Sequence, residues 1–400
     1  MVPTVHLRPG HVQPVWAGHP WVYAQAIDRL EGRAEPGDEV RVADPRGNFL
    51  GRGYWSPGSA IPVRIYSRDV DARLDDAFLA RRVTEAVAWR RALLDLPREG
   101  TDGLRLVNSE GDGLPGLIVD VFGPDLVVQL LTAGIKRREG AILDALLAAT
   151  GAARVWETAS PQHQKLEGIS ARDGILRGDP TEALRFTENG VALSVAAPGA
   201  AKDTQKTGYY FDQRDNRARV ARLARAKRVL DGFAYVGGFS LAAAKAGASS
   251  VLAVESGLGA ITAGEEITRA NGLDGVVRWR RGDVKKVFQD LHAQGERFDV
   301  VIIDPPKLAH NARELRDALS HYRRLNALAS ALVTPGGVLV SCSCSGAVGV
   351  DDLLRAIALG ARDANREVAV LDVHGAAADH PVPAAFPDGR YLKCVFGRVV

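Results

Sequence analysis

The sequence has few of the features that mark secreted, membrane-bound or disulfide-stabilised proteins. It contains three cysteines in 400 residues, which is too few for a disulfide framework, so we expect a reducing, cytoplasmic location. No stretch approaches the roughly 18 uninterrupted apolar residues of a membrane span. The first residues lack a basic segment followed by an apolar run, so we expect no signal peptide and no membrane partner.

An excess of charge of one sign is also missing. The chain has 51 Lys and Arg against 48 Asp and Glu, a formal net charge of +3, which gives no argument for a nucleic-acid partner. One segment differs, because residues 214–228 carry seven basic residues and one acidic residue. Such a run is most often the solvated face of a helix, and an RNA-facing surface is the alternative.

Internal repeats and low-complexity linkers are absent, and the length predicts two or three ordinary domains. Residues 1–72 hold short apolar runs separated by Gly- and Pro-containing turns, which predicts a small β-barrel. Near Asp71 the apolar residues begin to recur at steps of three or four, which predicts an amphipathic helix. Its apolar face contains Leu79, Val83, Ala86, Trp89 and Leu93.

The next segment, residues 73–190, continues with two hairpin signals, Gly123-Pro124-Asp125 and Asn189-Gly190. Together with a helix expected at 137–149, they predict a small α+β domain. From residue 191 to 400 we expect the third domain, in which strands and helices alternate after Lys227. Apolar runs at 228–233, 250–255, 298–304 and 336–343 indicate an α/β fold with a doubly wound, largely parallel sheet.

Ligands of such sheets bind at the carboxyl ends of the strands. The first strand ends at Asp231-Gly232 and is followed by Gly237-Gly238, which form no G-x-G-x-x-G fingerprint. Glu255, 24 residues after Asp231, ends the second strand, where an acid can accept both hydroxyls of a ribose. Asp283 lies near the third strand end. Taken singly, these residues also fit a tight turn or surface acids.

The last two strand ends are less common. Asp304-Pro305-Pro306-Lys307 forms a stiff loop, because proline restricts φ and lacks a donor. Cys342 and Cys344 lie at the next strand end, and Cys344 is the one nearer the ligand crevice. A lone cysteine is usually a packing residue, but a position beside the Asp-Pro-Pro loop favours a nucleophile. We interpret the third cysteine, Cys394, as a core or strand residue.

Seven ordered stretches resemble the RlmI/RlmO-type 23S ribosomal RNA cytosine-carbon-5 methyltransferases. The resemblance covers nearly the whole chain, and the stretches are HPWVY (19–23), GDGLPGLIVDVFG (111–123), KTGYYFDQRDNR (206–217), VLDGFAYVGGFS (229–240), DVVIIDPPK (299–307), SCSG (343–346) and ADHPVPAAFPDGRYLK (378–393). It implies an N-terminal PUA domain that positions RNA, a central α+β domain and a C-terminal Rossmann-like class I methyltransferase domain.

The resemblance further implies S-adenosylmethionine as the cofactor, 23S ribosomal RNA as the partner, and Cys344 and Asp304 as the catalytic residues. The cofactor would be bound by Gln213, Arg214, Asp231, Phe233, Tyr235, Gly237, Gly238, Glu255, Asp283, Asp304 and Pro305. No metal is implied, and the sequence leaves open whether the protein forms a homodimer, which cytosine is modified and which group removes the carbon-5 proton.

Two positions depart from the pattern of the family. Pro306 stands where many RNA enzymes of this chemistry have a second cysteine, so product release needs another base or water. Thr158-Ala159-Ser160 stands where relatives commonly carry Arg-Ser-Asp, which puts the RNA contacts or the choice of site in doubt.

Three alternatives remain. A guanine-N2 methyltransferase also uses Asn or Asp before Pro-Pro, but needs no cysteine. An NAD-dependent oxidoreductase shares the ribose acid, but G-x-G-x-x-G is absent and the Asp-Pro-Pro loop has no role in hydride transfer. A non-catalytic RNA-binding protein on a methyltransferase scaffold is disfavoured by the cofactor crevice and by Cys344.

Overall fold

The computed structural model describes residues 2–158, 161–200 and 208–400, and the chain divides into two compact units. The first comprises residues 1–187, 195–211 and 378–389, and the second comprises residues 188–194, 212–377 and 390–400. The boundaries at 72 and 190 remain predictions. Among the described residues, no helix combines the length and the apolar character needed to cross a bilayer.

The N-terminal part of the first unit is built around a six-stranded sheet with the order β2-β6-β5-β4-β1-β3. Its small core consists of Val, Leu and Ile side chains such as Val5, Val40 and Ile65. Burial alternates over the first residues of β4, whereas β5 and β6 each contain adjacent buried residues, so the alternation predicted for these runs holds only in part. The elements are β1 (Thr4–Leu7), α1 (Val12–Trp16), β2 (Trp21–Val22), β3 (Ile27–Glu31), β4 (Glu39–Ala43), β5 (Phe49–Trp55) and β6 (Val63–Ser67).

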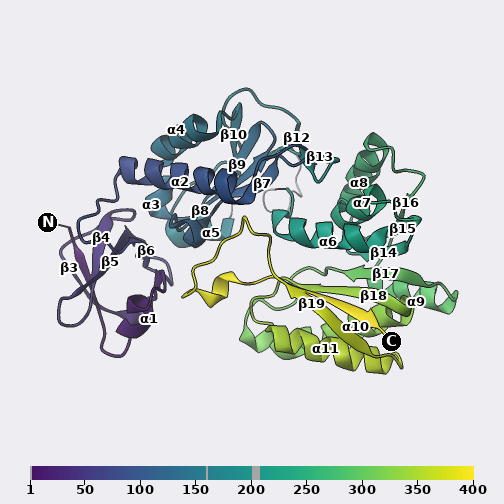
Figure 1. Ribbon diagram of the computed structural model, residues 1–400. Coiled ribbons are helices and arrows are strands. Elements are labelled where there is room, and N and C mark those ends of the chain that lie inside the picture. Colours follow the sequence, from purple (N-terminus) through teal and green to yellow (C-terminus); the bar gives the residue numbers. More distant parts are fainter. Residues whose placement is uncertain (1, 159–160, 201–207) are drawn as a thin grey trace. The chain divides into compact units, whose positions relative to one another are not determined.

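A five-stranded sheet of order β11-β10-β9-β8-β7 follows in the same unit, with α2 and α4 packed on it (Figure 1). Tyr54 and Tyr66, from the N-terminal strands, belong to its core. The elements are α2 (Asp76–Leu94), β7 (Gly103–Asn108), β8 (Leu117–Phe122), β9 (Asp125–Leu130), α3 (Ala133–Lys136), α4 (Glu139–Thr150), β10 (Arg154–Glu157), α5 (Pro161–Glu167), β11 (Gly174–Arg177), and the separate hairpin β12 (Ala183–Glu188) and β13 (Val191–Ala196).

The buried face of α2 differs from the predicted one at its C-terminal end. Leu93 is 77% exposed, whereas Arg90 is fully buried. The Arg90 guanidinium forms an ion pair with Asp112 and lies 4.0 Å from the ring centroid of Trp89. A pattern of apolar residues misses this arrangement, because the burial of an arginine depends on partners that are distant in sequence.

The second unit contains a seven-stranded sheet with the order β16-β15-β14-β17-β18-β20-β19. The first five strands are parallel and β20 is antiparallel to its neighbours. α6, α7 and α8 lie on one side, and α9, α10 and α11 on the other (Figure 1). The strand order reverses beside β14, which is where ligands bind in doubly wound sheets.

The strands β14, β15, β17 and β18 coincide with the four apolar runs predicted from the sequence. The antiparallel pair β19 and β20 was not predicted. The elements are α6 (Arg214–Ala224), β14 (Arg228–Gly232), α7 (Gly238–Lys245), β15 (Ser250–Glu255), α8 (Leu258–Ala270), β16 (Val277–Arg281), α9 (Val284–Ala293), β17 (Phe298–Ile303), α10 (Leu315–Leu332), β18 (Val333–Ser343), α11 (Val350–Asp363), β19 (Val368–His374) and β20 (Lys393–Val399).

Candidate active site

The predicted site residues gather at the carboxyl edge of the parallel strands. Asp231, Glu255 and Asp304 end or follow β14, β15 and β17, and Cys344 follows β18. The registers Gly232 to Ile303 and Ile303 to Ser341 align the ends of β14, β17 and β18. Parallel strands thereby bring together residues that lie about 110 positions apart in the sequence.

The turn after β14 has an unusual backbone. Phe233, Tyr235 and Gly237 all have positive φ, at 67°, 52° and 89°. Such a conformation is costly for Phe and Tyr and is concentrated at functional sites. Gly237 has no room for a side chain either, since a Cβ there would lie 2.9 Å from the indole of Trp279. The conformation of this loop therefore depends on tertiary contacts, and its predicted contact with the cofactor stays a prediction.

Asp231 is a buried acid at this edge. One carboxylate oxygen, Oδ2, accepts hydrogen bonds from the backbone N–H and the hydroxyl of Ser240, at 3.0 and 2.7 Å. The other, Oδ1, is buried and has no hydrogen-bond partner. Burial raises the pKa of Asp231 to about 7, and the nearby Asp304 and Glu255 add to this shift while Ser240 opposes it. A cationic ligand would relieve this cost.

Glu255 ends β15 with both carboxylate oxygens engaged. Oε2 accepts from the backbone N–H of Tyr235 at 2.9 Å, and Oε1 accepts from the N–H groups of Ser256 and Gly257 at 2.7 and 2.9 Å. Glu255 thus joins the turn after β14 to the turn after β15. The side chain remains half-buried, so a ligand hydroxyl can reach the same carboxylate.

Asp283 has a structural role in this conformation. It is the N-cap of α9, and its Oδ1 accepts from the backbone N–H of Lys286 at 3.0 Å. The residue is exposed and lies two positions after the end of β16. Its predicted contact with the cofactor stays a prediction.

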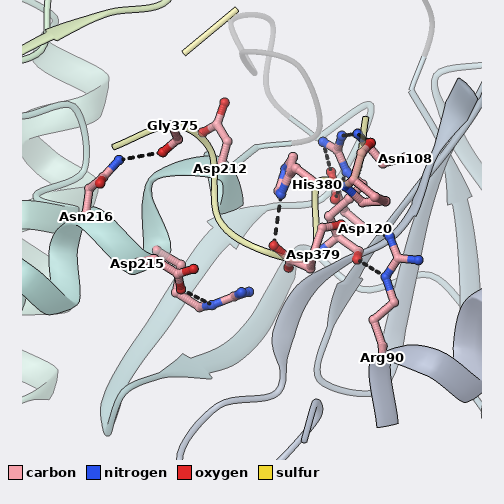
Figure 2. A network of polar contacts seen from close by, with 12 residues as sticks. Arg90, Asn108, Asp120, Asp212, Asp215, Asn216, Gly375, Asp379 and His380 are labelled. Carbon is pink, nitrogen blue, oxygen red and sulfur yellow. Dashed lines mark hydrogen bonds and ion pairs between the residues drawn. The ribbon is translucent and has the colours of Figure 1, made fainter. Parts of the chain in front are cut away.

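Gln213 and Asp304 form the polar connection between α6 and the loop after β17. Gln213 Nε2 donates to Asp304 Oδ2 at 2.9 Å, and Asn216 Nδ2 donates to Gln213 Oε1 at 2.7 Å. Asn216 also donates to the Gly375 carbonyl at 3.1 Å, a contact drawn in Figure 2. Gln213 therefore lies beside Asp304 and orients its carboxylate, and the predicted contact of Gln213 with the cofactor stays a prediction.

Arg214 and the basic run 214–228 fit the RNA-facing interpretation only in part. Arg214 is buried and lies 3.5 Å from Asp215, and Arg217 is buried in a bidentate ion pair with Glu188. Arg222 and Arg225 are exposed. The first half of the run is thus structural, and its charge is balanced by the partners that fold around it.

The three cysteines differ sharply in environment. Cys342 and Cys394 are fully buried on the paired strands β18 and β20, with their sulfur atoms 3.1 Å apart. Burial and the neighbouring Cys394 raise the pKa of Cys342 well above its ordinary value. Cys344 follows the end of β18 and is partly exposed. Cys344 is therefore the most exposed of the three cysteines, its role as the nucleophile stays a prediction, and Cys394 is a strand residue.

Polar groups around Cys344 join the ends of β17 and β18. Ser345 Oγ accepts from the backbone N–H groups of Leu308 and Ala309, both at 3.1 Å. The Tyr322 hydroxyl donates to Ser343 Oγ at 2.9 Å. Burial raises the pKa of Tyr322 to about 12, and the charges of Cys344 and Asp304 both add to this rise.

The sequence analysis did not single out Lys393, and the lysine that it names beside the Asp-Pro-Pro motif is Lys307. Lys307 is exposed, and the charge it influences is that of Glu314. Lys393 is buried at the start of β20 and interacts electrostatically with Cys344. Its place in the YLKC stretch was visible, but the pairing of β20 with β18 was not.

Some residues that the sequence analysis named are not among those that the structure describes. Lys206 and Thr207 of one matching stretch, and Ala159 and Ser160 of the departing segment, fall outside the described residues. Within the part of the chain that the structure describes, no group of three or more His, Cys, Asp or Glu could hold a metal ion.

Two family models match the chain. A PUA-like domain matches residues 5–68, and an S-adenosylmethionine-dependent methyltransferase matches residues 113–381. The chain is 37% identical to the ribosomal RNA large subunit methyltransferase I of Erwinia tasmaniensis over 98% of each protein. It is 38% identical to the protein of the same name from Shewanella denitrificans over 99% of each.

Solved structures share the fold over the full length. A putative methyltransferase complexed with SAH superposes with a TM-score of 0.84, and a putative S-adenosylmethionine-dependent methyltransferase from Streptococcus mutans with 0.82. Both are 19% identical and cover 100% of both chains. This likeness concerns the fold alone.

Proposed function

Because the chain belongs to the S-adenosylmethionine-dependent methyltransferases, in the family of the ribosomal RNA large subunit methyltransferases I, we propose that it forms 5-methylcytidine in 23S ribosomal RNA through a covalent adduct of Cys344. The observation that supports the cysteine chemistry is the partly exposed Cys344, which directly follows β18, while Asp304 directly follows the paired strand β17. The proposed substrate implies a cytoplasmic enzyme.

The residues at the strand ends fit the cofactor. S-adenosylmethionine carries a cationic sulfonium and an ammonium group, and it supplies an electrophilic methyl group when bound. The desolvated Asp231, with one unpartnered carboxylate oxygen, suits a cationic ligand. The half-buried Glu255 suits a ribose, and the turn of Phe233, Tyr235 and Gly237 allows a close approach of the backbone.

The chemistry of Cys344 follows from the weak nucleophilicity of cytosine carbon 5. The Cys344 thiolate adds to carbon 6, and the electron pair displaced from the ring double bond makes carbon 5 nucleophilic enough to take up a methyl group. A base then removes the carbon-5 proton, the ring double bond re-forms, and the sulfur–carbon bond breaks to release the Cys344 thiolate. Asp304, oriented by Gln213, would hydrogen-bond the base and favour the adduct.

The decisive experiment is to identify the methylated nucleoside. We expect purified enzyme, given 23S ribosomal RNA and labelled cofactor, to place the label in 5-methylcytidine. Bisulfite sequencing of ribosomal RNA from cells with and without the gene should locate one cytosine that is protected only when the gene is present. Label in N2-methylguanosine would contradict the proposal and support the guanine alternative.

Replacement of Glu255 with alanine is expected to weaken cofactor binding. Loss of a charge-assisted hydrogen bond costs about 1.5–3 kcal/mol, which corresponds to roughly a ten- to hundredfold rise in the dissociation constant. Isothermal titration calorimetry of the full chain with S-adenosylmethionine measures this dissociation constant. Glu265→Ala, which changes an exposed acid on α8, is the matched control and should bind as the wild type does. An unchanged affinity in Glu255→Ala would exclude Glu255 from the ribose site.

A further inference from the structure

Lys393 is a buried cation beside the proposed nucleophile. It is 5% exposed and begins β20, where its backbone lies opposite Ser343 of β18. Its ammonium donates to the carbonyl oxygens of Ser345 and Tyr391, at 2.7 and 2.9 Å. Ser345 directly follows Cys344, so these hydrogen bonds hold the ammonium at the end of the strand from which Cys344 projects.

The two carbonyls do not compensate the charge of Lys393. Neutral acceptors supply dipoles only, and a buried ammonium is costly without an anion. Burial lowers the pKa of Lys393, and Cys344 and Asp352 oppose this change. Asp352 lies in the first turn of α11, where it accepts from the Gly349 N–H at 3.0 Å and is half-exposed. It therefore screens Lys393 less effectively than a buried anion would.

Four other groups near this strand end, Asp304, Tyr322, Cys342 and Lys307, supply no positive charge to the sulfur of Cys344 in the contacts described below. Asp304, on the loop after β17, is an acid that raises the pKa of both Tyr322 and Cys342. The Tyr322 hydroxyl, from α10, already donates a hydrogen bond to Ser343. The Cys342 thiol is buried and donates a hydrogen bond to the sulfur of Cys394. Lys307 is exposed and faces Glu314. Lys393 is thus a cation held beside Cys344 through the carbonyl of the next residue, Ser345.

We propose that Lys393 is the cationic partner of the Cys344 thiolate, and that it maintains the thiolate for attack on the base. An ammonium has three donors, and the two carbonyls use two of them, which leaves one for the sulfur. The inference uses the Cys344 of the proposed function, but the state of the thiol can be measured without RNA or cofactor. Its failure and the failure of the proposed function are therefore distinguishable.

The test is the pH dependence of alkylation of Cys344 by iodoacetamide in the full chain, followed by peptide mass spectrometry. Only the thiolate reacts, and the buried Cys342 and Cys394 serve as internal unreactive sites. Lys393→Met should shift the midpoint of the rate profile upward by roughly one pH unit. At a pH below both midpoints the rate should fall about tenfold. Lys393→Arg should keep the midpoint near that of the wild type.

Two controls separate this effect from a general disturbance of the fold. Lys307→Met removes an exposed cation from the loop after β17 and should leave the midpoint unchanged. Thermal unfolding and cofactor titration show whether Lys393→Met is folded. If Lys393→Met does not fold, the wild type is compared with a peptide of residues 340–346. The alkylation midpoint of Cys344 in the wild type should then lie at least about one pH unit below its midpoint in the peptide.

The outcomes are clear-cut. Equal midpoints for folded Lys393→Met and the wild type, or for the wild type and the peptide, would overturn the inference. A shifted midpoint in an enzyme that makes no 5-methylcytidine would leave the inference standing and refute the proposed function. Methylation that depends on Cys344, combined with equal midpoints, would do the reverse.

Discussion

Replacing Cys344 with alanine is expected to reduce methyl transfer by at least about 10⁴-fold, because removal of a covalent nucleophile eliminates the pathway that it opens. Incorporation of labelled methyl groups into 23S ribosomal RNA measures the loss. Cofactor and RNA binding should persist, since Cys344 lies outside the buried core. The matched control is Cys342→Ala, two residues away, which should keep activity within about threefold of the wild type and lose some stability through the small cavity it creates.

The adduct itself can be isolated. RNA that contains 5-fluorocytosine should form a stable complex with the wild type, because fluorine at carbon 5 cannot leave as a proton does. The complex should survive denaturing electrophoresis, and peptide mass spectrometry should place it on Cys344. Turnover by Cys344→Ala, or an adduct on Cys342, would show that the nucleophile is assigned to the wrong sulfur.

Replacement of Asp304 with alanine is expected to lower the turnover number about 10²- to 10³-fold, the usual cost of removing a group that stabilises developing charge. Asp304 ends β17, and Gln213 orients its carboxylate from 2.9 Å. Asp304→Asn keeps the shape and one acceptor oxygen, so it should retain part of the activity. Single-turnover kinetics with saturating cofactor separates this loss from any change in cofactor affinity.

The control for Asp304 is Asp317→Ala, which removes an exposed acid from α10 and should leave turnover unchanged. Gln213→Ala should lower turnover by a smaller factor than Asp304→Ala, because Gln213 acts through the orientation of the carboxylate. Full turnover in Asp304→Ala would exclude a role for Asp304 in binding the cytosine base. Its predicted contact with the cofactor would then be the remaining role.

Much of the catalytic domain was determined by the sequence alone. Buried parallel strands read as continuous apolar runs, so β14, β15, β17 and β18 were visible before their partners were known. The residues that end these runs meet at one edge because the strands are parallel, which is a local property of the α/β pattern. Asp231, Glu255, Asp304 and Cys344 could therefore be selected without any knowledge of distance.

Other features depend on contacts between distant segments, and only the tertiary structure decided them. Lys393 lies 49 positions after Cys344 in the sequence, and the antiparallel pairing of β18 with β20 brings them together. Pairing with Cys394 likewise distinguishes the buried Cys342 from Cys344.

The charged residues Arg90 and Arg217 belong to the same group. The sequence analysis interpreted the run that contains Arg217 as a solvated helix face and did not include Arg90 in the buried face of its helix, but the structure buries both against Glu188 and Asp112. The physical reason is that a buried charge is tolerated only where a partner and its hydrogen bonds are in place. The local sequence pattern carries no information about such partners. The sequence by itself therefore determined where the strands end, whereas the tertiary structure determined which charged side chains are paired.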